Sequence, residues 1–177
     1  MKNYIPVLIL FFVSCSSEEE QMELNPTNWT QENSIEMNSV FSEEEDEEIE
    51  FFLETHPDWK MTKTGTGLRH FVYQHSRNTD SVQVEDVVTV DFEITLLDGT
   101  ICYTSEEKGP ESFVVEKTDI ESGLHEGIKL MCIGDRAKFI LPSHMAHGLI
   151  GDDDKIPPLT PVIYDISLLN IEKPIEK

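Results

Sequence analysis

The chain has 177 residues, of which 38% are hydrophobic and 27% charged, and its formal net charge is −22. This length allows one domain with extensions. The charge argues against a nucleic-acid-binding protein, because every contact with a phosphate would be repulsive. Much of the charge lies in two acidic runs before residue 60, which favours a solvated extension, with a specific acidic binding tail as the alternative.

The first fifteen residues have the pattern of an export signal. Lys2 precedes an apolar run over residues 5–13, which only Pro6 interrupts, and Cys15 follows. The run is too short to span a bilayer as a stable anchor. The pattern resembles a bacterial lipoprotein signal, so we predict that Cys15 is lipidated and anchors the protein in the cell envelope, at the outer membrane facing the periplasm. An ordinary signal peptide with an incidental cysteine is the alternative.

An acidic helix is predicted after a polar linker. Residues 16–41 lack hydrophobic periodicity and are expected to form a disordered acidic and polar tether. Ser42 and Glu45 have the spacing of a helix capping box. We therefore predict an acidic amphipathic helix over residues 42–57, ended by Pro57. Its apolar stripe would dock on the domain or on a second copy of the chain, which would form a homodimer, and the pattern does not choose between them.

The remainder of the chain alternates strand-like segments with turns, apart from one short helix over residues 122–131. Leu124, Ile128 and Met131 form the apolar stripe of that helix. The loop over residues 143–160 is long enough to suggest a function. The pattern is typical of an α+β fold with antiparallel strands and one helix on their concave face. Strands are predicted over residues 59–64, 68–74, 86–97, 100–104, 112–116, 135–142 and 162–171.

The sequence predicts neither a disulfide nor a metal site. Cys102 and Cys132 lack a framework spacing, so we expect free and largely buried thiols. His144 and His147 have the spacing of a metal-binding pair, and residues 152–154 are aspartates. No further ligands follow at a defined spacing, so we expect a polar loop tip and no metal site.

A set of collinear motifs runs from residue 86 to residue 171. They are Leu97-Asp98-Gly99-Thr100, Pro110 with Phe113, Gly123-Leu124 with Glu126-Gly127-Ile128, Met131, Gly134 and Ala137, then Ala146, Gly148 and Gly151, and finally Ile156-Pro157-Pro158 with Tyr164-Asp165. Together these motifs resemble the FKBP-type peptidyl-prolyl cis-trans isomerases, and with the lipoprotein start they are most similar to the gliding motility-associated branch. The resemblance implies an FKBP-like domain over residues 58–173, with a five- to six-stranded antiparallel sheet wrapped around one short helix.

The family resemblance also implies an activity. Such enzymes rotate Xaa-Pro bonds in an apolar groove and need no nucleophile, metal or cofactor. For this chain the resemblance implies a membrane-tethered isomerase and folding helper, whose partners are proline-containing segments of exported proteins. The resemblance places the groove at ten residues: Phe92, Cys102, Tyr103, Phe113, Ile120, Glu121, Leu124, His147, Ile156 and Tyr164.

Several groove positions depart from the family pattern. Leu124 replaces a tryptophan at the pocket floor, and Cys102 and Glu111 replace aromatic residues of the wall. Tyr103 stands in place of an aspartate, and His147 in place of a tyrosine that donates to the substrate carbonyl. Phe92 keeps the ring of the usual tyrosine but loses its hydroxyl, and Glu121 keeps the second family donor, a backbone N–H group. These departures predict weaker proline binding and slower turnover, and a catalytically weak binding or chaperone module, serving a gliding-motility or secretion apparatus, is the alternative.

Overall fold

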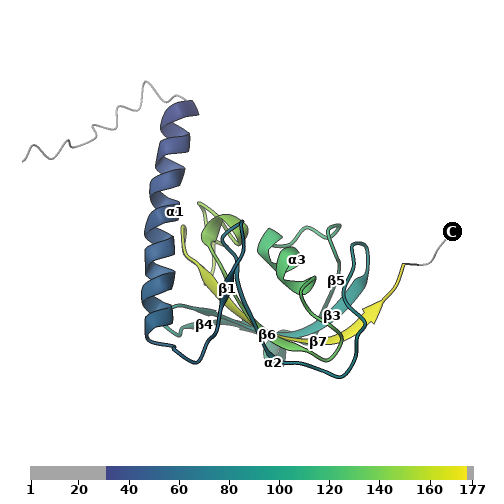
Figure 1. The fold of residues 1–177 in the computed structure, drawn as a ribbon. Coiled ribbons are helices and arrows are strands. Elements are labelled where there is room, and N and C mark those ends of the chain that lie inside the picture. Colours follow the sequence, from purple (N-terminus) through teal and green to yellow (C-terminus); the bar gives the residue numbers. More distant parts are fainter. Residues whose placement is uncertain (1–30, 175–177) are drawn as a thin grey trace, which may run out of the picture.

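The computed structural model describes residues 31–174, and the side chains of residues 40–174 (Figure 1). The predicted signal segment with Cys15, and residues 16–30 of the predicted tether, lie outside the described residues. In chain order the elements are α1 (Gln31–Glu54), β1 (Thr62–Lys63), β2 (Arg69–Gln74), β3 (Val87–Leu96), β4 (Ile101–Thr104), α2 (Ser105–Lys108), β5 (Glu111–Val114), α3 (Ser122–Ile128), β6 (Arg136–Leu141), the 3-10 turn η1 (Ser143–Met145) and β7 (Val162–Glu172).

The strands form one antiparallel sheet in the order β1-β2-β6-β7-β3-β4, with β5 also paired to β3. β4 pairs with the C-terminal half of β3 and β5 with its N-terminal half, so both lie on the same edge. The predicted α+β fold with an antiparallel sheet is confirmed. The sheet has seven strands instead of five or six. One reason is that α2 divides one edge strand into β4 and β5, and the other is that β1 counts as a strand although it has only two residues.

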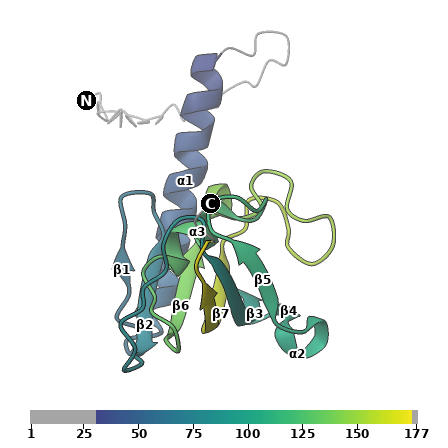
Figure 2. The ribbon, with the colours of Figure 1, turned by 90° about the vertical axis from the view of Figure 1, so that its right-hand side faces the viewer.

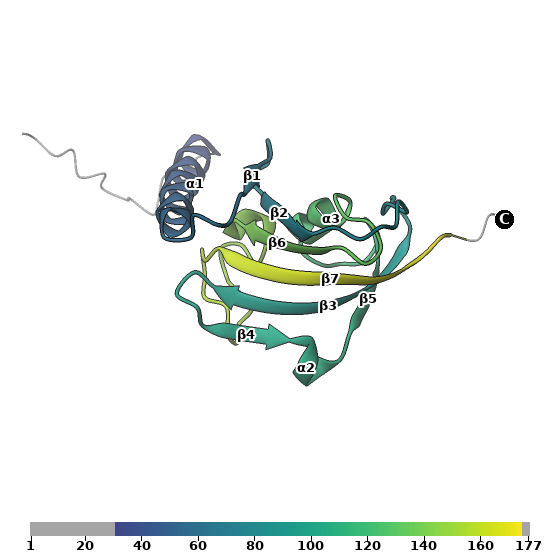
Figure 3. The same ribbon diagram turned by 60° about the horizontal axis from the view of Figure 1, so that its bottom comes forward.

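The core fills the concave side of the sheet. Side chains of a strand alternate between its two faces, and the inward positions of β3 and β7 are buried apolar residues. α3 lies directly on this face (Figure 3) because two of its residues lack side chains. A Cβ atom at Gly127 would lie 2.9 Å from the ring of Phe139, and one at Gly123 would lie 2.5 Å from Leu141. The glycines therefore fix how closely α3 approaches β6.

The N-terminal helix begins earlier than the sequence pattern predicts. α1 starts at Gln31, so the boundary predicted between residues 16–41 and 42–57 was wrong. Residues 31–41 contain neither glycine nor proline, and extending a formed helix is far easier than starting one. Ser42 is an interior helix residue and caps nothing. Figure 2 shows the N-terminal part of α1 rising beyond the rest of the domain.

The C-terminal half of α1 is docked on the domain. Ile49 is fully buried and packs with Ile140 and Ile163, on the face of the sheet opposite α3. Glu45, the intended partner of the capping box, is instead buried and accepts hydrogen bonds from the backbone N–H group and the hydroxyl of Ser143. Docking on the domain is thus observed, and a homodimer through residues 42–57 stays a prediction.

Other boundaries differ by a few residues. The strand predicted over residues 59–64 shrinks to β1, because the backbone at Trp59 and Met61 makes turn hydrogen bonds instead of ladder ones. The helix predicted over residues 122–131 ends at Ile128 and continues as a turn. Cys102 and Cys132 are free as predicted, although only Cys102 is fully buried. Within residues 31–174, no helix combines the length and the apolar character that crossing a membrane requires.

Candidate functional site

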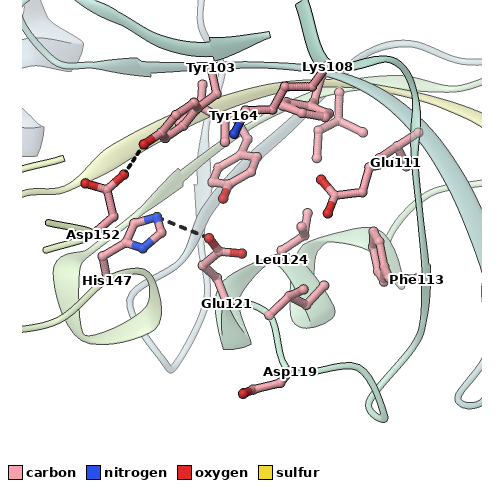
Figure 4. A pocket seen from close by; sticks show the side chains of 15 residues that line it. Tyr103, Lys108, Glu111, Phe113, Asp119, Glu121, Leu124, His147, Asp152 and Tyr164 are labelled. Carbon is pink, nitrogen blue, oxygen red and sulfur yellow. Dashed lines mark hydrogen bonds and ion pairs between the residues drawn. The ribbon is translucent and has the colours of Figure 1, made fainter. Parts of the chain in front are cut away.

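A pocket of about 350 Å³ opens on the concave face, between the sheet, α3 and the long loop after β6 (Figure 4). Its deep part is apolar, and its rim carries charged side chains. Residues 146–156 of the loop cover one side of the pocket and are called the flap below. The lining consists of Val90, Phe92, Ile94, Tyr103, Lys108, Glu111, Phe113, Asp119, Ile120, Glu121, Leu124, His147, Asp152, Tyr164 and Ile166.

Eight of the ten residues that the family resemblance places in the groove line this pocket. The other two, Cys102 and Ile156, are buried in the core. Cys102 alternates with Tyr103 along β4, so the two side chains point in different directions. Its thiol faces the backbone oxygens of Thr100 and Lys155, at 3.9 and 3.8 Å. The eight that line the pocket are Phe92, Tyr103, Phe113, Ile120, Glu121, Leu124, His147 and Tyr164.

The structure adds pocket residues that the sequence comparison missed. Val90 and Ile94 share a face of β3 with Phe92, so the period-two alternation of this strand could have identified them. Lys108 is the exposed last residue of the short helix α2 and Asp119 lies in an exposed turn, where neither alternation nor composition marks them. Asp152 belongs to the flap, whose path has no local sequence signal.

A network of polar contacts ties the flap to β4. The Tyr103 hydroxyl donates to Asp152 and, at 3.2 Å, to Asp154. Oδ1 of Asp152 also accepts the backbone N–H groups of Ile156 (2.7 Å) and Asp154 (3.0 Å). Partial burial opposes ionisation of Asp152, but these hydrogen bonds outweigh it and lower its pKa to about 2. The Lys155 ammonium completes the network by donating to the backbone oxygen of Cys102 at 2.6 Å.

His147 faces Glu121 across the mouth of the pocket (Figure 4). Nε2 of His147 lies 3.1 Å from the carboxylate, which makes an ion pair whenever the imidazole is protonated. The approach is out of line with the ring N–H bond, so this buried nitrogen makes no hydrogen bond within the described residues. His147 therefore lines the pocket and faces a carboxylate, and its role as a carbonyl donor stays a prediction.

Two further donors lie in the pocket lining. The side chain of Tyr164 is buried, and its hydroxyl points into the cavity near the Glu121 carboxylate (Figure 4). Burial, together with the nearby Glu121 carboxylate, raises the pKa of Tyr164 well above its ordinary value, so the phenol is neutral. Across the same described part of the chain, the backbone N–H group of Glu121 also donates to no partner.

This arrangement suits binding and conformational chemistry. The described lining contains neutral donors above an apolar floor, and residues 40–174 hold no group of three or more His, Cys, Asp or Glu side chains placed to bind a metal ion. An apolar ring would fit on the floor while the donors meet a peptide carbonyl. Fold and pocket together define a class of small α+β domain in which a curved antiparallel sheet and one helix enclose an apolar pocket with a polar rim.

Comparison with known proteins identifies the class more closely. The family described as FKBP-type peptidyl-prolyl cis-trans isomerase matches residues 78–169, which is over half of the chain. The chain belongs to this family, as its motifs predict.

The most similar relatives include bacterial FkpA proteins. The chain is 31% identical over 112 residues to the probable isomerase FkpA of Neisseria meningitidis, covering 63% of this chain and 40% of the relative. It is 34% identical over 115 residues to FkpA of Aeromonas hydrophila, covering 64% and 41%. The crystal structure of FkpA from Escherichia coli superposes with a TM-score of 0.64 at 25% identity, covering 80% of this chain and 64% of that one. This chain therefore spans about two-fifths of the length of the two curated relatives.

Proposed function

We propose that this protein is a membrane-tethered peptidyl-prolyl cis-trans isomerase that assists the folding of exported proteins. The observation that carries the proposal is an apolar pocket in a domain of this family, lined by two donors: the Tyr164 hydroxyl and the backbone N–H group of Glu121, which has no partner within the described residues. Uncatalysed proline isomerisation takes tens of seconds, so an exported chain gains from such a helper.

The pocket would act by preferring a twisted amide. Rotation about an Xaa-Pro bond costs about 18–20 kcal/mol, because the twisted geometry loses amide resonance and its charge separation. An apolar floor at Phe92 and Leu124 favours this less charge-separated state over the planar one. A donor at Tyr164 or Glu121 would hold the carbonyl as it turns. Only interactions stronger in the twisted state than in the planar state accelerate the rotation.

Refolding of a proline-limited substrate tests the activity. The full chain should accelerate the slow refolding phase in proportion to its concentration, and Leu124→Trp should raise the rate further, because the larger ring fills the floor. Leu169→Trp is the matched control, since Leu169 is exposed on β7 and away from the pocket. A slow phase that does not change at high protein concentration would contradict the proposed activity.

A binding or chaperone module is the second candidate. Glu111 in the pocket wall and the leucine floor favour it, as do two exposed apolar side chains on the flap, Leu149 (62% exposed) and Ile150 (71% exposed). Titration with peptides separates the two candidates. Saturable binding that does not depend on proline, with no effect on isomerisation, would support the module.

Tethering would come from a lipid on Cys15, with α1 between the anchor and the domain. Cys15→Ala should move the protein from the membrane fraction to the soluble fraction, and a protein that stays bound would be anchored elsewhere. The exposed Phe51 on α1 supports a homodimer through residues 42–57. Service to a gliding-motility apparatus rests only on the similarity of the motifs to that branch of the family.

A further inference from the structure

We infer that the pocket selects Xaa-Pro segments that carry a lysine or arginine next to the proline, and that Glu111 recognises this basic residue. The inference rests on the proposed isomerase function and names its substrate class. It is carried by the side chains that surround the apolar floor and by which of them already have partners.

Carboxylates outnumber cations in the pocket lining, and most of the charged groups are already engaged. Asp152 is held by Tyr103 and by two backbone N–H groups. Glu121 faces His147 at 3.1 Å. The one lysine, Lys108, places its ammonium 3.7 Å from the centre of the Tyr103 ring, away from every carboxylate with which it could form an ion pair. No cation of the described lining therefore neutralises the remaining acids.

Glu111 is the acid that is both free and directed at the cavity. It opens β5 two residues before Phe113, and side chains two apart on a strand share a face. Phe113 is buried against the pocket, so Glu111 projects on the same side, and Figure 4 shows its carboxylate turned toward the interior. Within residues 40–174 it makes neither an ion pair nor a hydrogen bond through its side chain. Asp119 has no such partner either, but Figure 4 shows it pointing away from the cavity.

A second, independent sign of a ligand is Nε2 of His147 in the pocket lining, a buried nitrogen that makes no hydrogen bond within the described residues. A buried polar group without a partner is costly. The hydroxyl of Tyr164, whose residue is 3% exposed, points into the same cavity. A lysine ammonium has three donors and a guanidinium has five. Either cation could donate to both the Glu111 carboxylate and the Tyr164 oxygen. The faces of Phe113 and Tyr164 add a cation–π attraction.

The apolar floor and the acidic wall of the pocket would then each bind a different part of the Xaa-Pro segment. The apolar floor accepts the proline ring, and the acidic wall accepts the neighbouring side chain. An acidic neighbour would instead meet Glu111 and Glu121, and like charges at close range disfavour binding. Because Glu111 is exposed, this preference should weaken as salt rises.

Isomerisation and binding of short peptides test the inference. The probes are two series with lysine, leucine or glutamate directly before or directly after one proline, followed by NMR exchange for the rate and by titration for affinity. In at least one series the full chain should prefer lysine over glutamate by about fivefold or more at low salt. Glu111→Gln should reduce this ratio toward one, and Glu111→Lys should reverse it. Glu48→Gln on the exposed side of α1 removes the same charge and should leave the ratio unchanged.

The outcomes separate this inference from the proposed function. Equal rates for the lysine and glutamate peptides in both series, with isomerisation present, would overturn the charge selection and leave the enzyme. Tighter, Glu111-dependent binding of lysine peptides without any isomerisation would support the selection and overturn the enzyme. A lysine preference that Glu48→Gln reduces as much as Glu111→Gln would reflect the net charge of the chain and overturn the role of Glu111.

Discussion

Tyr103 shows how a change of one residue can create a new contact between the pocket wall and the flap. The family resemblance implies an aspartate at this position, inside the groove. In this chain the longer phenol reaches across to the flap and donates to Asp152 and Asp154. The carboxylates at this part of the pocket therefore belong to the flap, and a side-chain contact joins the pocket wall to its covering loop.

Removal of this hydroxyl should loosen the flap. Tyr103→Phe should lower the free energy of unfolding by about 1 kcal/mol, the usual contribution of one hydrogen bond. Amide hydrogen exchange should accelerate at Asp154 and Ile156, whose N–H groups are held by Asp152. Tyr73→Phe is the control, because it removes a hydroxyl bonded to Asp165 at 2.7 Å outside the pocket. A flap that exchanges equally fast in both variants would mean that the Tyr103 contact does not hold it.

The same contact predicts a pH dependence. The pKa of Asp152 falls from an ordinary 3.8 to about 2 in the folded state, so its ionised form stabilises the fold fully above the higher value. This stabilisation is lost as the pH falls from about 4 to about 2. Amide proton shifts of Asp154 and Ile156 should titrate with a midpoint near 2, and Asp152→Asn should abolish the transition. A midpoint near 3.8 would show that the hydrogen bonds do not favour the carboxylate.

At the scale of single residues, the sequence predicts the apolar pocket well and its polar contacts poorly. Leu124, Phe113 and Tyr164 follow from collinear motifs and line the pocket as expected. The partners of Asp152 and the unpaired state of Glu111 depend on how two distant segments meet. Neither periodicity nor composition encodes such distances, so these features depend on the three-dimensional structure.

At the scale of elements, α1 is fixed by buried charge as well as by apolar packing. Arg69 is 1% exposed, and its guanidinium lies 2.6 Å from Asp46 and 2.8 Å from Glu50 of the helix. It also donates to the backbone oxygen of Gly67 at 2.9 Å. A buried cation needs such partners, because removing its anions leaves an uncompensated charge.

Neutralisation of both anions should therefore destabilise the domain. The double variant Asp46→Asn with Glu50→Gln should lower the free energy of unfolding by about 2 kcal/mol, which is modest for a buried charge because both carboxylates are partly exposed. Urea unfolding measures this change. Glu47→Gln with Glu48→Gln removes the same charge from the exposed side of α1 and should cost less than about 0.5 kcal/mol. An equal loss in the two double variants would show that net charge, and not the Arg69 contact, sets the stability.

The elements also show where sequence reasoning stops. Alternation located every strand except for its ends, because β-strand periodicity is local. The start of α1 was misplaced by eleven residues, since an acidic Ser-x-x-Glu pattern fits a helix interior as well as a cap. Glu45 is needed by Ser143, which lies 98 residues further along the chain. A contact of that separation has no signal in the local pattern.

At the scale of the whole molecule, the scaffold and the pocket wall are separable. One apolar cluster fills the space between α3 and the sheet, and a smaller one joins α1 to the opposite face. The charged wall residues Lys108, Glu111 and Asp119 belong to neither cluster. Changes in the wall can therefore alter what the pocket binds while the two clusters keep the fold.

The docking of α1 on the domain determines where the pocket lies relative to the N-terminal end of this helix. A helix rises 1.5 Å per residue, so the 24 residues of α1 form a rod of about 36 Å, and only its C-terminal half is held by the domain. Whatever is joined to the free end is kept at a set distance and bearing from the pocket mouth. The pocket would then stay within a limited range of positions above that attachment point. Adding or removing one residue of α1 would turn the direction in which the pocket faces by about 100° about the helix axis.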